Sequence, residues 1–148
     1  TSEDFGRVAV ASRTYAATNP KAFFYDRPAT LEDHQNSRWI VEPLHLLDCC
    51  QESDGGQAIV VTSTERARDL PNPPAVISAA AQGTYPEQEM MTSYYRPQLG
   101  IPEMGIVAEQ LYATAGIGPD DIQTAILYDA FSPLVLLTHV DFRFCPRG

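Results

Sequence analysis

Three short apolar runs, each followed by a helical pattern, constrain the fold of this chain most strongly. They span 57–62, 75–81 and 123–128, and turn-forming residues bound them. Runs of this length with few charged residues are typical of strands that are buried on both faces of a sheet. Strands that alternate with helices favour a largely parallel sheet with helices on its faces. The sequence therefore predicts an α/β fold.

Helices are expected where apolar spacing and end signals agree. The clearest covers 104–115, where apolar residues recur every three or four positions and Gly116 follows as a left-handed cap. An amphipathic helix is expected behind Thr1 and Ser2, ending before Asn19. The other predicted helices are a short one capped by Thr30, one over 64–70, and one that begins at Ser132-Pro133 and runs to about Val140.

A proline cluster divides the chain. Pro71-Asn72-Pro73-Pro74 suits neither a helix nor the interior of a strand. We therefore expect a linker at 72–74 between a first unit, residues 1–71, and a second unit, residues 75–148. Within the first unit the pattern over 20–43 is irregular and rich in aromatic residues, which indicates a loop subdomain.

Charge and cysteine content narrow the class of protein. The 148 residues carry 10 Lys+Arg against 19 Asp+Glu, a net charge of −9, which disfavours nucleic acid and anionic membranes as partners. No apolar run approaches the about 20 residues that span a bilayer. The three cysteines include the adjacent pair Cys49 and Cys50, which suits free thiols better than a disulfide. Free thiols predict the cytoplasm.

The end of the last predicted strand is one candidate site. In open α/β sheets, ligands bind beyond the carboxyl ends of the strands, beside helix N-termini. The sequence there reads Tyr128-Asp129-Ala130-Phe131. Tyr128 can donate or accept a proton, and Asp129 can orient or polarise a neighbour. In a purely structural interpretation, Asp129 caps the turn and Tyr128 packs half-buried.

A polar loop over 48–56 is the second candidate, because its glycines permit a close approach of the backbone; the alternative is a simple turn. A metal site built from His34, His45, Cys49 and Cys50 is conceivable, but their spacing matches no zinc pattern. We therefore expect no metal, and expect both histidines at the surface or in loops. The motifs of serine hydrolases, P-loop proteins and dinucleotide-binding proteins are absent from the sequence.

Several segments resemble the thiolase superfamily. Residues 46–61, LLDCCQESDGGQAIVV, are similar to the stretch that leads into the last strand of the first half of the thiolase fold. The letters CQESDG resemble the lipid-transfer branch, which comprises sterol-carrier-protein-X-like thiolases and steroid side-chain retro-aldolases. Residues 128–133 align with the Asn-Glu-Ala-Phe and His-Asp-Cys-Phe motifs of the family, and residues 144–148 resemble the stretch after the next helix.

The resemblance implies a layered α-β-α-β-α fold of two halves, a homo-oligomer, and a coenzyme A thioester as substrate with no separate cofactor. Residues 1–71 then correspond to the end of the first half and 75–148 to the start of the second. We expect the chain to be an incomplete, internal portion that spans this junction and is inactive by itself. Cys49, Cys50 and Cys145 match none of the catalytic cysteine motifs of thiolases, so no nucleophile is assigned to them.

The resemblance also suggests roles for single residues. Tyr128 replaces the asparagine or histidine of the motif, as in the retro-aldolase branch, where a tyrosine could move the proton of the aldol oxygen. An unperturbed phenol has a pKa of about 10, so this tyrosine would need a partner or a field to act as a base. Cys50 falls on the position beside the pantetheine arm, and Ser53 and Phe131 are further candidates for substrate binding.

The resulting prediction is retro-aldol or thiolytic carbon–carbon cleavage of a steroid or fatty acyl-CoA, with Tyr128 and Asp129 as catalytic residues. The alternative is a non-catalytic acyl-CoA-binding or lipid-binding module that assembles with a partner. The lipid-transfer branch is associated with small partners that carry an OB-fold and a zinc ribbon. Residues 85–95, rich in Met and Tyr, would form that interface, or else a lid or core packing. Unpaired strand edges also predict self-association.

Overall fold

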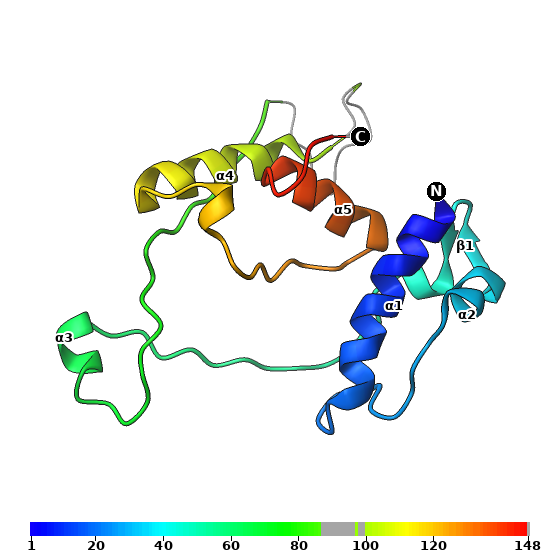
Figure 1. Cartoon of the computed structure of the whole chain (residues 1–148), viewed down its shortest axis with the longest axis horizontal. Helices are drawn as coiled ribbons and strands as arrows, with labels where there is room; N and C mark the ends of the chain where they lie inside the picture. Colours follow the sequence, from blue (N-terminus) through cyan, green and yellow to red (C-terminus); the bar gives the residue numbers. More distant parts are fainter. Residues whose placement is uncertain (87–96, 98–99, 148) are drawn as a thin grey trace. The chain divides into compact units, whose positions relative to one another are not determined.

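A computed structural model describes residues 1–86, 97 and 100–147 (Figure 1). Its elements are α1 (Ser2–Thr18), α2 (Leu31–Asn36), β1 (Trp39–Val41), β2 (Leu44–His45), the 3-10 turn η1 (Leu46–Asp48), α3 (Thr64–Ala67), α4 (Pro102–Ala115), the 3-10 turn η2 (Pro119–Asp121) and α5 (Ser132–Asp141). They belong to two compact units. One unit comprises 1–51 and 123–148, and the other comprises 52–122.

Local end signals fix the helices of the first unit. Thr1 and Asp4 form a capping box at the start of α1, and Asn19 ends the helix in an extended conformation. At α2, the Thr30 hydroxyl accepts a hydrogen bond from the Asp33 amide at 3.1 Å, while the Asp33 carboxylate accepts one from the Thr30 amide at 2.8 Å. Both predicted caps are confirmed. The last helix, α5, begins at Ser132 as predicted, but Ser132 is its first residue and not its cap, because the N-cap is Phe131.

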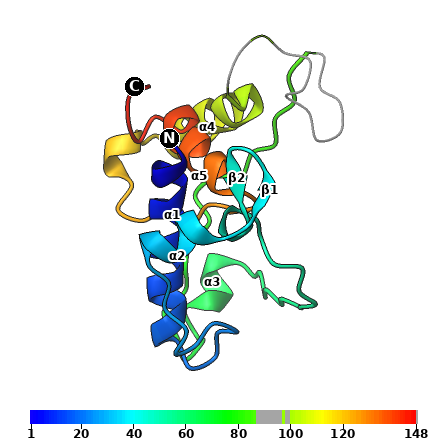
Figure 2. The ribbon, with the colours of Figure 1, turned by 90° about the vertical axis from the view of Figure 1, so that its right-hand side faces the viewer.

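Gly6 allows α1 and α2 to approach closely. A Cβ at this position would lie 2.6 Å from Leu31 Cδ1 and 2.8 Å from His34 Nδ1. Both distances are shorter than side-chain carbons tolerate, so a residue without a side chain is required here. In Figure 2, α1 in blue lies beside α2 in cyan and α5 in orange-red, and α1 contacts both helices.

A small hairpin replaces part of the predicted loop subdomain. β1 and β2 pair antiparallel, and Trp39 lies opposite His45. Their rings stack with centroids 3.6 Å apart. The η1 turn follows directly and contacts α1. The irregular sequence pattern did not predict this hairpin, because its strands are too short to show alternation.

The predicted sheet is not formed among the described residues. The runs 57–62, 75–81 and 123–128 carry no strand pairing, and the β1–β2 hairpin is the sheet that the described part of the chain contains. Val60 is 91% exposed and Ile126 is 97% exposed. The prediction of strands buried on both faces is therefore wrong for this structure. A parallel strand acquires its hydrogen bonds and its burial only from neighbouring strands.

In the unit 52–122, the helices follow the sequence signals closely. α3 begins behind Ser63, whose hydroxyl accepts a hydrogen bond from the Arg66 amide at 3.3 Å, one residue before the predicted cap. α4 ends at Ala115, and Gly116, with a φ of 68°, is the predicted left-handed cap. The proline linker at 72–74 lies inside this unit, and the division of the chain there stays a prediction.

Polar side chains make up most of the buried set. Among the described residues, the buried hydrophobic residues are Ala67 and Ala108, whereas His34, His45, Asp48, Ser132 and Thr138 are buried and polar. No helix in the described part of the chain combines the length and the apolar character needed to cross a bilayer. All five of these buried polar residues belong to the first unit, which is therefore the place to look for a site.

Candidate functional site

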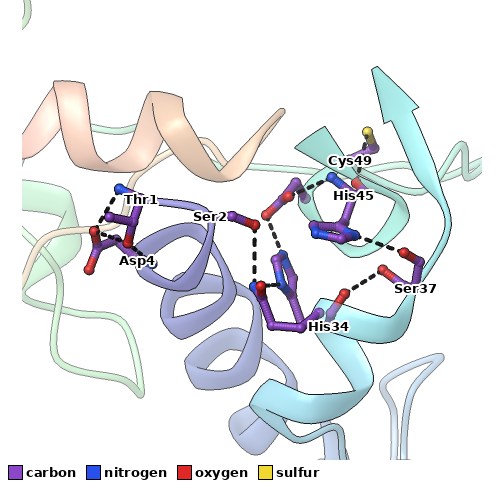
Figure 3. Close-up of polar contacts among 9 residues, drawn as sticks. Thr1, Ser2, Asp4, His34, Ser37, His45 and Cys49 are labelled. Atoms are coloured by element: carbon purple, nitrogen blue, oxygen red, sulfur yellow. Dashed lines mark hydrogen bonds and ion pairs between the residues drawn. The ribbon is translucent and has the colours of Figure 1, made fainter. Parts of the chain in front are cut away.

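A histidine and an aspartate pair in the interior of the first unit. His34 Nε2 lies 2.8 Å from Asp48 Oδ1, and both side chains are 0% exposed. The other oxygen, Asp48 Oδ2, accepts a hydrogen bond from the His45 amide at 2.8 Å. A buried carboxylate is tolerated when donors of this kind replace its lost water. Figure 3 shows His34 and His45 on neighbouring elements, with these contacts dashed.

The second nitrogen of His34 is also engaged. Gln35 Nε2 lies 3.0 Å from His34 Nδ1 and 3.2 Å from the hydroxyl of Ser2 in α1. With this amide donating to Nδ1, His34 carries its proton on Nε2 and donates it to Asp48. Residues from α1, α2 and η1 thus hold one imidazole ring in one orientation.

His45 is held by a hydrogen bond and by an aromatic contact. Its Nδ1 donates to the Ser37 carbonyl at 2.7 Å, and its ring stacks on Trp39. His45 Nε2 is buried and has no hydrogen-bond partner among the described residues. The prediction that His34 and His45 lie at the surface or in loops is wrong, because they are 0% and 2% exposed and lie in α2 and β2.

Backbone pairing joins the two loops that the sequence singled out. Cys49, directly after η1, forms an antiparallel bridge with Phe131. The Cys50 amide donates to the Ala130 carbonyl at 3.0 Å. The predicted substrate-binding residues Cys50 and Phe131 are therefore on paired segments, and Asp129 is next to the pairing. The sequence pattern did not predict this pairing.

Burial and the Asp48 carboxylate shape the electrostatics of these segments. The pKa of Asp129 is raised above its ordinary value, first by burial and second by the negative charge of Asp48. The pKa of the Cys49 thiol is raised by burial, by Asp48 and by Cys50. A raised pKa keeps Cys49 as a thiol, which is the less nucleophilic form.

The remaining predicted site residues have different surroundings. Tyr128 is 79% exposed, so it is not half-buried packing, and Phe131 is 37% exposed. Asp129 does not cap α5, because the N-cap of that helix is Phe131. Ser53 belongs to the unit 52–122, whereas Cys50 belongs to the first unit.

The other predicted sites add little to this picture. The described residues include no group of three His, Cys, Asp or Glu side chains that could hold a metal ion. Most of the predicted interface at 85–95 lies outside the described residues.

Sequence comparisons identify similar proteins. Residues 87–148 match the thiolase C-terminal domain-like family. The whole chain is 72% identical to a steroid side-chain-cleaving aldolase of Thermomonospora curvata and covers 38% of it. The whole chain is also 62% identical to a 17-hydroxy-3-oxo-4-pregnene-20-carboxyl-CoA lyase of Mycobacterium tuberculosis and covers 39% of it. A benzoylsuccinyl-CoA thiolase subunit of Thauera aromatica is 35% identical over the whole chain, which covers 37% of that subunit.

A solved structure gives the same assignment. The chain superposes with a TM-score of 0.97 on a protein described as Ltp2-ChsH2(DUF35) aldolase, at 72% identity, and covers 39% of it. The chain thus spans less than two fifths of the length of these relatives. The predicted thiolase-like fold is confirmed by this superposition, and the resemblance to steroid-cleaving enzymes is confirmed by the identity to the aldolase and to the lyase. The chain is therefore similar to proteins of the thiolase superfamily, and its residues 87–148 match a thiolase C-terminal domain-like family.

Proposed function

We propose that this chain supplies part of the active site of an enzyme that cleaves a carbon–carbon bond of a steroid acyl-CoA by a retro-aldol reaction. The observation that carries the proposal is the pairing of Cys49 and Cys50 with Ala130 and Phe131, which joins the segment of Cys50 to the segment that follows the exposed Tyr128. The 72% identity to a steroid side-chain-cleaving aldolase supports the choice of reaction.

The reaction needs one group that takes a proton and one that gives a proton. The β-hydroxyl of the acyl-CoA loses its proton, the bond between Cα and Cβ breaks, and the oxygen becomes a carbonyl. The electron pair passes into the thioester enolate, which then takes up a proton at Cα. In the proposed step the ionised side chain of Tyr128 takes the hydroxyl proton and becomes the phenol, which can then give a proton to Cα of the enolate. Its exposed position lets it meet the substrate. Asp129 has a raised pKa, which suits a supporting carboxyl that holds a proton more readily than an ordinary one does.

Substrate contacts are assigned to the residues around this pair. Cys50 is exposed and Phe131 is partly exposed, so both can contact the pantetheine arm or the steroid rings. We include Ser53 on the basis of the family resemblance alone. Coenzyme A is then the carrier of the substrate, and the reaction as written needs no separate cofactor. The free thiols of Cys49, Cys50 and Cys145 suit a reducing compartment, and we place the enzyme in the cytoplasm.

The test uses the full-length protein that carries this chain and a steroid β-hydroxyacyl-CoA. Replacing Tyr128 by Phe removes the proton-transferring hydroxyl, so kcat should fall by at least about 100-fold with little change in KM. Tyr15→Phe is the matched control, because Tyr15 is a similarly exposed tyrosine on α1. Unchanged turnover in Tyr128→Phe would overturn the role of Tyr128.

A partner-binding role is the second candidate, because one observation favours it. The similar solved structure is described by the names of two components, Ltp2 and ChsH2(DUF35). We propose that the full-length protein forms a homo-oligomer that binds a small acyl-CoA-binding partner with an OB-fold and a zinc ribbon. Size-exclusion chromatography of the mixture should show co-elution. Separate elution would count against this assembly.

A further inference from the structure

We infer that the buried His34–Asp48 pair positions the residues of the proposed cleavage site, by fixing the end of η1, which leads directly into the residues Cys49 and Cys50 that pair with Phe131 and Ala130. This inference deepens the proposed function and rests on it. Neither side chain reaches solvent, so neither touches the substrate. They are therefore positioning residues, whose effect passes through the backbone of Cys49 and Cys50.

The pair is anchored from several elements. His34 is held by Gln35, which also contacts Ser2 of α1. Asp48 uses one oxygen for His34 and the other for the His45 amide at the start of η1. Both acceptor atoms of the carboxylate are occupied, which limits the positions that η1 can take. A side chain fixed in this way transmits its position to the backbone that follows it.

The chain leaves the anchored Asp48 directly into the pairing with the site. Cys49 bridges to Phe131 and Cys50 donates to the Ala130 carbonyl, so both residues that follow Asp129 are held by residues that follow Asp48. A displacement of about 1 Å at such a point can change a reaction rate by about 100-fold. The geometry therefore couples the buried His34–Asp48 pair to the partly exposed carboxyl of Asp129.

The charge of Asp48 also acts on Asp129. Asp129 senses the negative charge of Asp48, which with burial raises its pKa. Asp48 is hydrogen-bonded to His34 from α2 and to the His45 amide from β2. Its charge also acts on the Cys49 thiol, on which the charge of Arg38 has the opposite effect. Removing the charge of Asp48 should therefore lower the pKa of Asp129 towards its ordinary value.

Asp48→Asn is the main test, in the full-length protein. Asn keeps the shape of the side chain and one acceptor oxygen but removes the charge. We expect kcat to fall about 10- to 100-fold with KM changed less than about threefold, as for outer partners of functional groups. The limb of the kcat profile that reports Asp129 should move to lower pH. Asp120→Asn, which neutralises an exposed carboxylate in η2, is the control. It should leave both kcat and the pH profile of kcat unchanged.

Variants of His34 separate positioning from folding. His34→Gln retains an amide donor and should keep most of the activity, whereas His34→Ala should lose it. If these proteins do not fold, Gln35→Leu leaves the His34–Asp48 contact in place, removes the contacts of Gln35 to His34 Nδ1 and to Ser2, and should lower kcat several-fold. Folded variants with unchanged kcat and an unchanged pH profile would overturn the inference, as would a change in thermal stability alone.

A titration of the Asp129 carboxyl by 13C NMR, in wild type and Asp48→Asn, separates this inference from the proposed function because it needs no turnover. A lower pKa of Asp129 in Asp48→Asn supports the coupling, even if Tyr128→Phe proves fully active. An unchanged pKa of Asp129 contradicts it, even if retro-aldol cleavage is found.

Discussion

The segment 30–50 and the apolar run 57–62 are neighbours in the sequence but differ in how they are stabilised. The first is short of large apolar residues in its interior, yet its caps, its hairpin and the His34–Asp48 pair satisfy one another. The second is almost entirely apolar, yet Ile59 and Val60 are 85% and 91% exposed. The first segment therefore contains most of the partners of its own polar groups, whereas the second depends on strands that do not pair with it among the described residues.

The largest expected effect on stability is in the segment 30–50. Asp48→Ala should lower the free energy of unfolding by about 3 kcal/mol, because it leaves the His34 side chain and the His45 amide buried without their acceptor. Urea unfolding monitored by the fluorescence of Trp39, which stacks on His45, measures this loss. Asp54→Asn, at an exposed carboxylate, should cost less than about 0.5 kcal/mol. Equal losses in the two variants would contradict the importance of the pair.

A smaller effect is expected where α1 meets α2. Gly6→Ala places a Cβ 2.6 Å from Leu31 Cδ1 and 2.8 Å from His34 Nδ1, so these side chains or the helices must shift, at a cost of about 1–3 kcal/mol. The matched control is Gly56→Ala, because a Cβ there meets nothing within 4 Å. The same unfolding measurement applies to both. A Gly6→Ala protein as stable as the control would show that the helix contact is looser than described.

Asp129→Asn is expected to change the free energy of unfolding by less than about 1 kcal/mol, because the site is partly exposed. The pKa of Asp129 is raised in the fold from its ordinary value of 3.8. The folded protein therefore binds the proton of Asp129 more tightly than the unfolded chain does. This contribution to the free energy of unfolding is fully present below pH 3.8, and it is lost as pH rises through the raised pKa. The stability of Asp129→Asn relative to wild type should rise over this interval and then level off. A difference that does not change with pH would contradict the raised pKa.

The smallest effect on stability is expected in the apolar run. Val60→Lys should change the free energy of unfolding by less than about 0.5 kcal/mol, because the side chain is already exposed. It should nevertheless reduce self-association of the chain, since a lysine on an unpaired strand opposes pairing with another copy. Light scattering after size exclusion measures the association. A large loss of stability would show that the run is packed.

Local signals predicted the helices well because each signal acts within a few residues. Thr30 with Asp33, Gly116, and Ser132 with the following proline each mark a helix end that the structure has. The apolar runs were predicted from composition alone, which reports that a segment needs burial but not whether its partners are present. The similarity to longer thiolase-like proteins confirms the fold class although these runs are unpaired.

The candidate site was predicted only in part, for the same reason. Resemblance and position in the sequence predict Tyr128, Asp129, Cys50 and Phe131 as site residues, and these roles stay predictions. The backbone pairing between their segments depends on contacts distant in sequence. The buried role of His34 was missed, because its burial depends on Gly6 in another helix. The one local signal was Asp48 three residues after His45, the spacing that also caps α2.

The identity of the reaction products tests the central claim most directly. The full-length protein is incubated with a steroid β-hydroxyacyl-CoA in the absence of free coenzyme A, and the products are identified by mass spectrometry. Retro-aldol cleavage predicts one steroid ketone or aldehyde for each shortened acyl-CoA, with both formed without added thiol. Cleavage that requires free coenzyme A and yields two thioesters, or no cleavage of any such substrate, would contradict the claim.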